Sequence, residues 1–316
     1  MIAIEEIMAA RERIAGAAVR TPLVRLEVDS APSEIWCKLE TVQPVNSFKI
    51  RGAANCVRAA DPALVRDGLV TASAGNMAHG VAWIARELGV PATIAVPEHA
   101  PAAKLDAIAR LGGRALKMPY ADWWQAIVTS RVEGVEGFFV HPVSDPAVMA
   151  GNGTIGVEIL EDLPDADAVV IPFGGGGLTV GIASAVRALR PAARVYTVEP
   201  ETGAAAVAAR AAGEPTAVDY TPSWIDGSGS RSVLDDMWPR VAPLIDDALA
   251  VTLAETAAAV RLIAERLRVI SEGAGALALA AALAGRAGAG KIVAVVSGGN
   301  IDLAAFTRIL DGGQPA

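Results

Sequence analysis

The stretch Ala168-Val-Val-Ile-Pro-Phe-Gly-Gly-Gly-Gly-Leu178 joins a short apolar run to four consecutive glycines. The apolar run has the length of a buried strand, and an amphipathic segment follows the glycines. Consecutive glycines let several backbone N–H groups converge where that segment begins a helix, and the helix N-terminus favours an anion there. The order of strand, glycines and helix therefore predicts a phosphate-binding turn in an α/β fold. No Gly-Lys-Ser/Thr follows, so the turn is not a P-loop.

The same alternation of short apolar runs and longer amphipathic runs extends over most of the chain. Continuous apolar strands joined by helices are typical of parallel sheets covered on both faces. A single sheet would need many strands in one row, so two parallel-sheet lobes are more economical for 316 residues. We expect a large cofactor-binding domain of residues 1–60 and 147–316, with a small domain of residues 61–146 inserted in it. The predicted strands are 36–40, 68–72, 90–97, 114–118, 137–140, 168–172, 194–199 and 291–296, and helices are predicted at 101–111 and 121–132.

Composition excludes several classes of protein. The formal net charge is -8 and no basic tract stands out, so a nucleic-acid partner is not expected. The two cysteines, Cys37 and Cys56, provide no disulfide framework and no Cys-rich metal site, and we expect them to stay reduced in a cytoplasm. The N-terminus carries acids where a signal peptide carries Lys or Arg, and the most apolar runs are too short to span a bilayer.

Three further segments carry chemistry beside the glycine turn. In parallel sheets ligands bind beyond the carboxyl ends of strands, and 73–77 (Ser-Ala-Gly-Asn-Met) and 297–300 (Ser-Gly-Gly-Asn) both follow predicted strands. The first can bind a carboxylate at a helix start, and the second lets a flat ligand approach Ser297. In 46–52 (Asn-Ser-Phe-Lys-Ile-Arg-Gly), Lys49 stands between two apolar residues, where burial would make its amine nucleophilic. Together these features describe pyridoxal phosphate and an amino acid.

The sequence resembles the fold-type II pyridoxal-phosphate enzymes of the threonine/serine dehydratase and serine racemase family. The likeness runs from about Thr21 to about Asp302 and implies a tryptophan synthase β-like fold. Nine ordered motifs carry it: Lys38-Leu-Glu, Ser47-Phe-Lys-Ile-Arg-Gly-Ala53, Ser73-Ala-Gly-Asn76, His141-Pro, Asp145-Pro, Ala150-Gly-Asn-Gly-Thr-Ile-Gly156, Gly174–Leu178, Glu272-Gly-Ala-Gly-Ala276 and Ser297-Gly-Gly-Asn300.

The resemblance assigns a role to each site residue. Lys49 would hold the cofactor as a Schiff base and act as the catalytic residue, with Phe48 beside the ring. Asn76 would bind the phenolic oxygen, and Ser297 would meet the pyridine nitrogen. The phosphate would be held by Gly174, Gly175, Gly176, Gly177 and Leu178. The substrate carboxylate would be bound by Ser73, Ala74, Gly75, Asn76 and Met77.

Several positions depart from the family pattern. Ala74 stands where racemases have a serine that moves a proton, so racemisation is disfavoured. Met77 replaces the usual His, and the pair Trp123-Trp124 stands where smaller polar residues are usual; this pair predicts either helix packing or an aromatic wall of the substrate site. Glu199 matches one ligand of the family's divalent-cation site, but Ala205 occupies the position of the second carboxylate, so no metal is expected.

We therefore expect a cytoplasmic homodimeric ammonia-lyase (dehydratase) that converts a 3-hydroxy amino acid resembling L-threonine or L-serine into a 2-oxo acid and ammonia. The alternatives on the same fold are a β-replacement synthase and an amino-acid racemase. Two further alternatives need no lysine at position 49: a nicotinamide oxidoreductase, with Glu199 at a distance that suits a ribose, and a non-catalytic amino-acid-binding protein.

Overall fold

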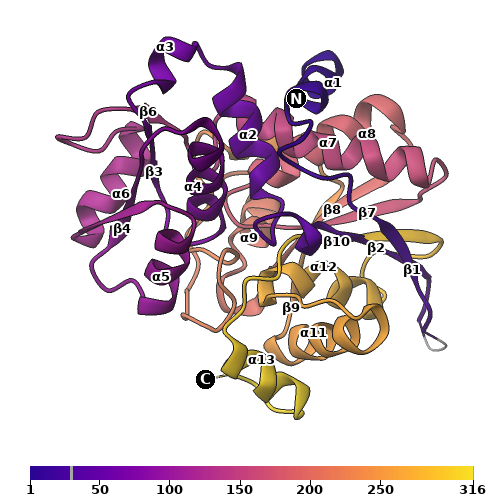
Figure 1. The fold of residues 1–316 in the computed structure, drawn as a ribbon. Coiled ribbons are helices and arrows are strands. Elements are labelled where there is room, and N and C mark those ends of the chain that lie inside the picture. Colours follow the sequence, from indigo (N-terminus) through magenta and orange to yellow (C-terminus); the bar gives the residue numbers. More distant parts are fainter. Residues whose placement is uncertain (29–30, 316) are drawn as a thin grey trace.

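The computed structural model describes residues 1–28 and 31–315 and contains two separate β-sheets flanked by helices (Figure 1). The strands of the six-stranded sheet are, in spatial order, β1 (Leu23–Leu26), β2 (Glu34–Leu39), β10 (Lys291–Val296), β7 (Ala168–Pro172), β8 (Arg194–Pro200) and β9 (Asp247–Val251). Those of the four-stranded sheet are β5 (Arg114–Met118), β4 (Ala92–Pro97), β3 (Leu69–Ala72) and β6 (Phe138–Phe139).

Strand pairing is parallel throughout both sheets except at one edge. β1 pairs with β2 in the antiparallel sense, whereas the sequence predicted parallel sheets only. The reason is the short connection of residues 27–33, because a parallel pair needs a crossover of about a dozen residues or more. β1 was not predicted, and neither was β9 in the poorly patterned segment 201–250.

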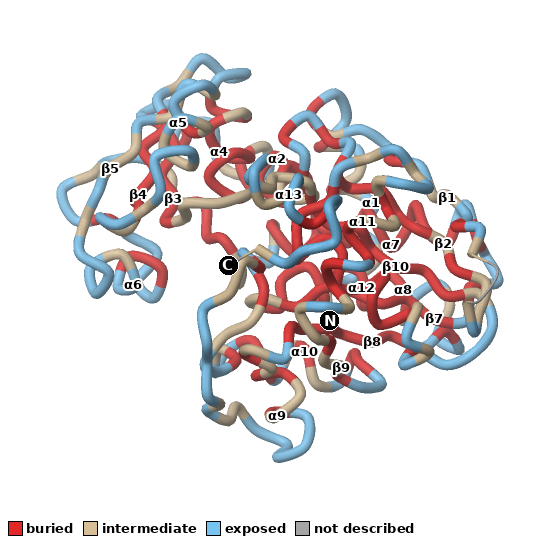
Figure 2. Tube along the Cα trace, turned by 90° about the horizontal axis from the view of Figure 1, so that it is seen from below, coloured by how far each residue is buried: buried red, intermediate tan, exposed pale blue. Residues whose placement is uncertain are grey.

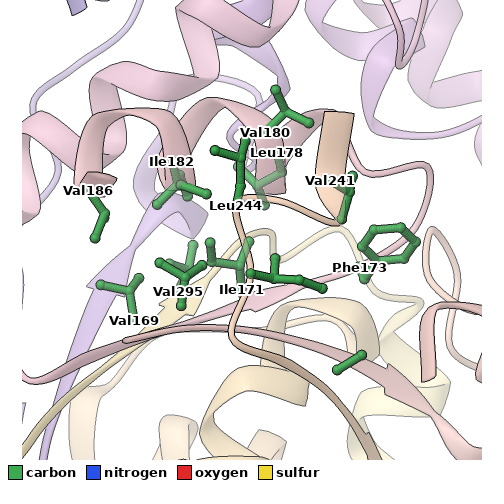
Figure 3. Packing of buried hydrophobic residues seen from close by; sticks show 14 of the residues in the cluster. Val169, Ile171, Phe173, Leu178, Val180, Ile182, Val186, Val241, Leu244 and Val295 are labelled. Carbon is green, nitrogen blue, oxygen red and sulfur yellow. The ribbon is translucent and has the colours of Figure 1, made fainter. Parts of the chain in front are cut away.

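Helices cover both faces of the six-stranded sheet. Successive side chains of a strand point to opposite faces, so Val169 and Ile171 of β7 pack toward α8, while Ala168 and Val170 pack on the other side with α12. Figure 3 shows the first of these layers. The longer helices are α1 (Ile4–Arg13), α2 (Lys49–Ala59), α4 (Asn76–Leu88), α5 (Ala102–Arg110), α6 (Tyr120–Thr129), α7 (Pro146–Asp162), α8 (Gly177–Leu189), α9 (Ala205–Ala212), α11 (Leu253–Leu267), α12 (Gly273–Leu283) and α13 (Leu303–Leu310); α3 (Pro62–Val65) and α10 (Trp238–Val241) are single turns.

The four-stranded sheet and its helices α4, α5 and α6 form a small lobe, and the remaining elements around the six-stranded sheet form a large lobe (Figure 1). Every strand of the small lobe lies between Leu69 and Phe139. The domain boundaries 61 and 146 stay a prediction. Figure 2 shows the buried segments concentrated in the large lobe, with more exposed chain around the small one.

The segment 223–233, predicted as an ordered loop, contains no helix or strand. Among the helices of residues 1–28 and 31–315, none has the length and apolar character that a membrane crossing requires.

Candidate active site

A cavity of about 410 Å³ is lined by residues that directly follow β3, β7 and β10, together with the start of α2. The carboxyl ends of parallel strands from both lobes thus face one site, as is typical of open parallel sheets. The structure brings all thirteen sequence-predicted site residues to this cavity: Phe48, Lys49, Ser73, Ala74, Gly75, Asn76, Met77, Gly174, Gly175, Gly176, Gly177, Leu178 and Ser297.

Lys49 is the first residue of α2, and its side chain lies in the cavity wall. The Nζ atom donates to the carbonyl oxygen of Pro142 at 2.7 Å and lies 5.2 Å from the centre of the Phe48 ring. Burial lowers the pKa of Lys49 from its ordinary 10.5 to about 8, because removal from water disfavours the charged amine. Near neutral pH the unprotonated fraction of this amine is therefore much larger than that of an ordinary lysine, and a nucleophile or a general base requires the unprotonated form.

The glycine turn presents backbone donors to the cavity. Gly176, the N-cap of α8, has φ +92°, and no side chain caps the helix. Within residues 1–28 and 31–315, no acceptor takes the N–H groups of Gly174 through Leu178. A Cβ at position 177 would lie 2.5 Å from the carbonyl oxygen of Val143, so only glycine fits there. Five unused donors at a helix N-terminus suit a phosphate group.

The start of α4 presents a second group of donors. The N–H groups of Ala74, Asn76 and Met77 meet no acceptor in the described part of the chain. The N–H of Ser73 donates to the carbonyl oxygen of Ala95 at 3.1 Å, and the Ser73 hydroxyl accepts from Gly75 N at 3.2 Å. A carboxylate bound here would therefore meet the hydroxyl of Ser73 but not its backbone N–H.

Further residues of the small lobe line the cavity. His79, Lys104, Tyr120 and Trp123 line it, and only the tryptophan was singled out from the sequence. Lys104 Nζ lies 2.9 Å from a carboxylate oxygen of Asp226 in the large lobe, so this ion pair bridges the two lobes. Trp123 forms part of the cavity wall and also packs in the small-lobe core. The neighbouring Trp124 is 39% exposed and does not line the cavity.

Sequence reasoning also missed the roles of Glu272 and Asn300. Both line the cavity beside Ser297, and both contact Asn76 from the large lobe. Glu272 was part of a quoted motif, but its contact with Asn76 spans 196 residues. A carboxylate in an otherwise apolar, glycine-rich helix start is the one local signal that could have identified it.

A buried ion cluster lies on the other side of α2. Arg51 donates to Glu40 at 2.8 Å and to Glu158 at 2.6 Å, and Lys38 donates to Glu158 at 2.6 Å. Arg51 and Glu40 are almost wholly buried. The two carboxylates raise the pKa of the Arg51 guanidinium, although burial opposes them. Two cations thus face two carboxylates, and every charge in the cluster has a counter-charge.

Glu199 lies outside the cavity and does not form part of a cation site in the described residues. One carboxylate oxygen accepts from Ala206 N at 2.7 Å and Val207 N at 3.3 Å, where α9 begins. Burial raises the pKa of Glu199 to about 8. Ala205 offers no second carboxylate, and residues 1–28 and 31–315 contain no cluster of three or more His, Cys, Asp or Glu side chains suited to a metal. The residues present therefore do not fit the divalent cation of the family.

Comparison with known proteins gives concordant findings. The family described as "Pyridoxal-phosphate dependent enzyme" matches residues 14–298. An L-threonine ammonia-lyase of Thermotoga maritima is 38% identical over 99% of this chain and 79% of its own length. The catabolic L-threonine dehydratase TdcB of Escherichia coli K12 is 36% identical over 98% of this chain and 96% of its own. The structure of maize serine racemase superposes with a TM-score of 0.90 at 32% identity, covering 98% of this chain and 97% of the other.

Proposed function

The chain belongs to the pyridoxal-phosphate dependent enzymes, and on this basis we propose that it is an ammonia-lyase, or dehydratase, of a 3-hydroxy amino acid. The resemblance noted in the sequence and the two-lobed α/β fold are confirmed by the family match and by the superposition. One observation carries the proposal: a buried amine with a lowered pKa shares a cavity with two separate groups of unused backbone N–H donors. One group suits a phosphate and the other a carboxylate.

The cavity residues fit the cofactor. Lys49 would hold it covalently through Nζ, and the N–H groups of Gly174–Leu178 would bind its phosphate. Phe48 would flank the ring, Asn76 would bind the phenolic oxygen, and Ser297 would donate or accept at the ring nitrogen. When bound, pyridoxal phosphate supplies an electron sink for the charge left at the substrate Cα.

Backbone and side-chain groups of this chain would bind the substrate and move the proton. The donors at the start of α4 would hold the substrate carboxylate and orient the Cα–H bond. The unprotonated Nζ of Lys49 would take the Cα proton, which its lowered pKa favours. Departure of the β-hydroxyl with a proton removes one water from the substrate. The enamine that is released then takes up one water and yields a 2-oxo acid and ammonia.

The side chain at position 74 favours elimination over racemisation. Ala74 lines the cavity and carries no group that could return a proton to the opposite face of Cα. A racemase needs an acid or base on each face, whereas a lyase needs only the lysine. A β-replacement synthase would release product only when a second nucleophile is present.

These alternatives are tested with purified holoenzyme and three substrates: L-threonine, L-serine and 3-hydroxyaspartate. We expect 2-oxo acid and ammonia in equal amounts from at least one of them, without an added nucleophile and without D-enantiomer. Lys49→Ala should lose this activity, and Lys117→Ala, at an exposed position of β5, should keep it. Accumulation of D-amino acid, or turnover only with an added thiol, would replace the lyase by a racemase or a synthase.

The oligomeric state and the cellular location are part of the same proposal. We propose a homodimer in the cytoplasm, where the buried thiols of Cys37 and Cys56 would stay reduced. Light scattering coupled to gel filtration tests the dimer, since a monomer mass would exclude it.

A further inference from the structure

Glu272 stands at the N-cap of α12 but does not cap that helix. No hydrogen bond joins its side chain to the first turn, whereas Asp302 caps α13 with bonds to Ala304 N and Ala305 N. The Glu272 carboxylate instead turns into the cavity and is 7% exposed. A cap is worth about 1 kcal/mol of helix stability, so its absence indicates that the carboxylate is used elsewhere.

Both Glu272 carboxylate oxygens accept hydrogen bonds from other elements. Asn76 Nδ2 donates to Oε1 at 2.7 Å, and the backbone N–H of Asn300 donates to Oε2 at 3.1 Å. The side chain of Asn300 closes the triangle, because its Nδ2 donates to Asn76 Oδ1 at 2.7 Å. Gly298 permits this approach, since a Cβ at that position would collide with Oε1. These contacts join α4 of the small lobe to two parts of the large lobe: the start of α12, which carries Glu272, and the segment after β10, which carries Asn300.

This arrangement fixes which way the Asn76 amide points. An ionised carboxylate only accepts hydrogen bonds, so the nitrogen of the amide must face Glu272. The Asn300 amide nitrogen only donates, so the Asn76 oxygen must face it. The second N–H of Asn76 Nδ2 has no acceptor in the described residues, and Asn76 lines the cavity.

We propose that Glu272 is a positioning residue that orients the Asn76 amide as a donor toward an anionic oxygen of the bound cofactor. The inference rests on the proposed role of Asn76 at the phenolic oxygen, but it does not depend on which reaction the enzyme catalyses. Replacement of the carboxylate would remove the acceptor of Asn76 Nδ2 and leave only the Asn300 contact to orient the amide. An amide that then rotates would present its oxygen, which would repel a phenolate.

Because Glu272 is titratable, its hydrogen bonds to Asn76 and Asn300 should depend on pH. Burial raises the pKa of Glu272 to about 7, assisted by the nearby carboxylate of Asp226 and opposed by the Asn76 bond and by Lys104. His79, Lys49 and Tyr120 are the other titratable groups that line the cavity beside Glu272, Asp226 and Lys104. Protonation below pH 7 removes the negative charge and makes one carboxyl oxygen a donor, which weakens the carboxyl group as an acceptor for Asn76 Nδ2 and Asn300 N.

The test is the absorption spectrum of the holoenzyme, recorded without substrate between pH 6 and pH 8.5. A phenolate absorbs at longer wavelength than a phenol. In the wild type, we expect the long-wavelength band to strengthen as the pH rises through about 7. Glu272→Gln should lack this transition, and Glu272→Ala should show a weaker long-wavelength band at every pH and bind pyridoxal phosphate about tenfold less tightly. Asp302→Asn, which neutralises a helix-capping carboxylate outside the cavity, should leave the spectrum and its pH dependence unchanged.

Two results would overturn the proposal. One is a Glu272→Gln spectrum that keeps the wild-type transition. The other is an effect of Glu272→Gln on a protein that already carries Asn76→Ala, because a residue that acts through Asn76 has no effect in its absence. Gln has nearly the same shape as Glu, so this variant keeps the test valid if Glu272→Ala fails to fold. Failure of the lyase assay with a normal spectral transition would reject the proposed reaction and leave this inference standing.

Discussion

Lys49 and Arg51 are two residues apart in α2, yet their environments are opposite. Arg51 is 1% exposed and has two carboxylate partners, so its charge is compensated within the fold. Within the described residues, Lys49 has one carbonyl partner and no carboxylate partner, and burial lowers its pKa to about 8. A buried charge with complete pairing therefore supports the structure, whereas a buried charge without it is available for chemistry.

The strongest test of this comparison is to remove the unpaired amine. Lys49→Met should lower turnover of the hydroxy amino acid by at least about 10³-fold, because both the cofactor attachment and the proton acceptor are lost. Oxo-acid release measured at saturating pyridoxal phosphate checks this, with Lys117→Met as the exposed control. Turnover within tenfold of the wild type would remove Lys49 from the mechanism.

Removal of the paired charge of Arg51 should instead lower the stability of the fold. Arg51→Met leaves Glu40 and Glu158 buried with reduced compensation, and we expect a loss of about 3–5 kcal/mol in the free energy of unfolding. Urea denaturation of the apoenzyme measures it, and Arg66→Met, whose side chain is 79% exposed, provides the control. A loss no larger than that of the control would show that the cluster is not a structural requirement.

The same contrast should appear in the pH dependence of apoenzyme stability. The pKa of Lys49 is lower in the folded chain than its ordinary 10.5, so the unfolded chain binds more protons between pH 8 and pH 10. Stability contributed by this group therefore rises with pH over that window, by on the order of 2 kcal/mol after allowance for its partial exposure. Comparison of wild type and Lys49→Met by denaturation at pH 7.5 and pH 9.5 isolates the effect. Parallel changes in the two proteins would contradict the lowered pKa.

The smallest effect is expected at the ion pair that bridges the lobes. Asp226 is 70% exposed in this pair, so Lys104→Met should change the free energy of unfolding by less than about 1 kcal/mol. Thermal denaturation of the apoenzyme with and without added salt measures the change. A larger loss would mean that this exposed pair stabilises the fold as the buried Arg51 pairs do.

Local pattern was sufficient to predict the parts of the site that follow strands. β7 and the glycine turn are contiguous in sequence, so strand, turn and helix start could be assigned from 168–178 alone. β5 and β10 were predicted with their observed bounds for the same reason. Lys49 was harder, because the burial that lowers its pKa depends on the whole fold, and the apolar neighbours Phe48 and Ile50 were the only local signal for it.

Contacts between distant segments could not be predicted. Nothing near Glu272 in the sequence indicates that its carboxylate meets Asn76 rather than its own helix. The edge strands β1 and β9 were missed because their short runs are only partly buried and carry a weak apolar pattern. The position of a strand within a sheet is a property of the whole fold, not of the strand.

The strand order has a consequence for biosynthesis. β10 lies between β2 and β7 and pairs with both, although it is the last strand of the chain to be made. On the ribosome, the large lobe would remain without its central strand until residue 296 emerges. The small lobe, whose strands are contiguous between Leu69 and Phe139, could form its sheet much earlier. Protease digestion of nascent chains arrested near residue 200 would then find the small lobe protected and the large lobe still open to cleavage, so the enzyme would acquire its active site only after β10 has emerged.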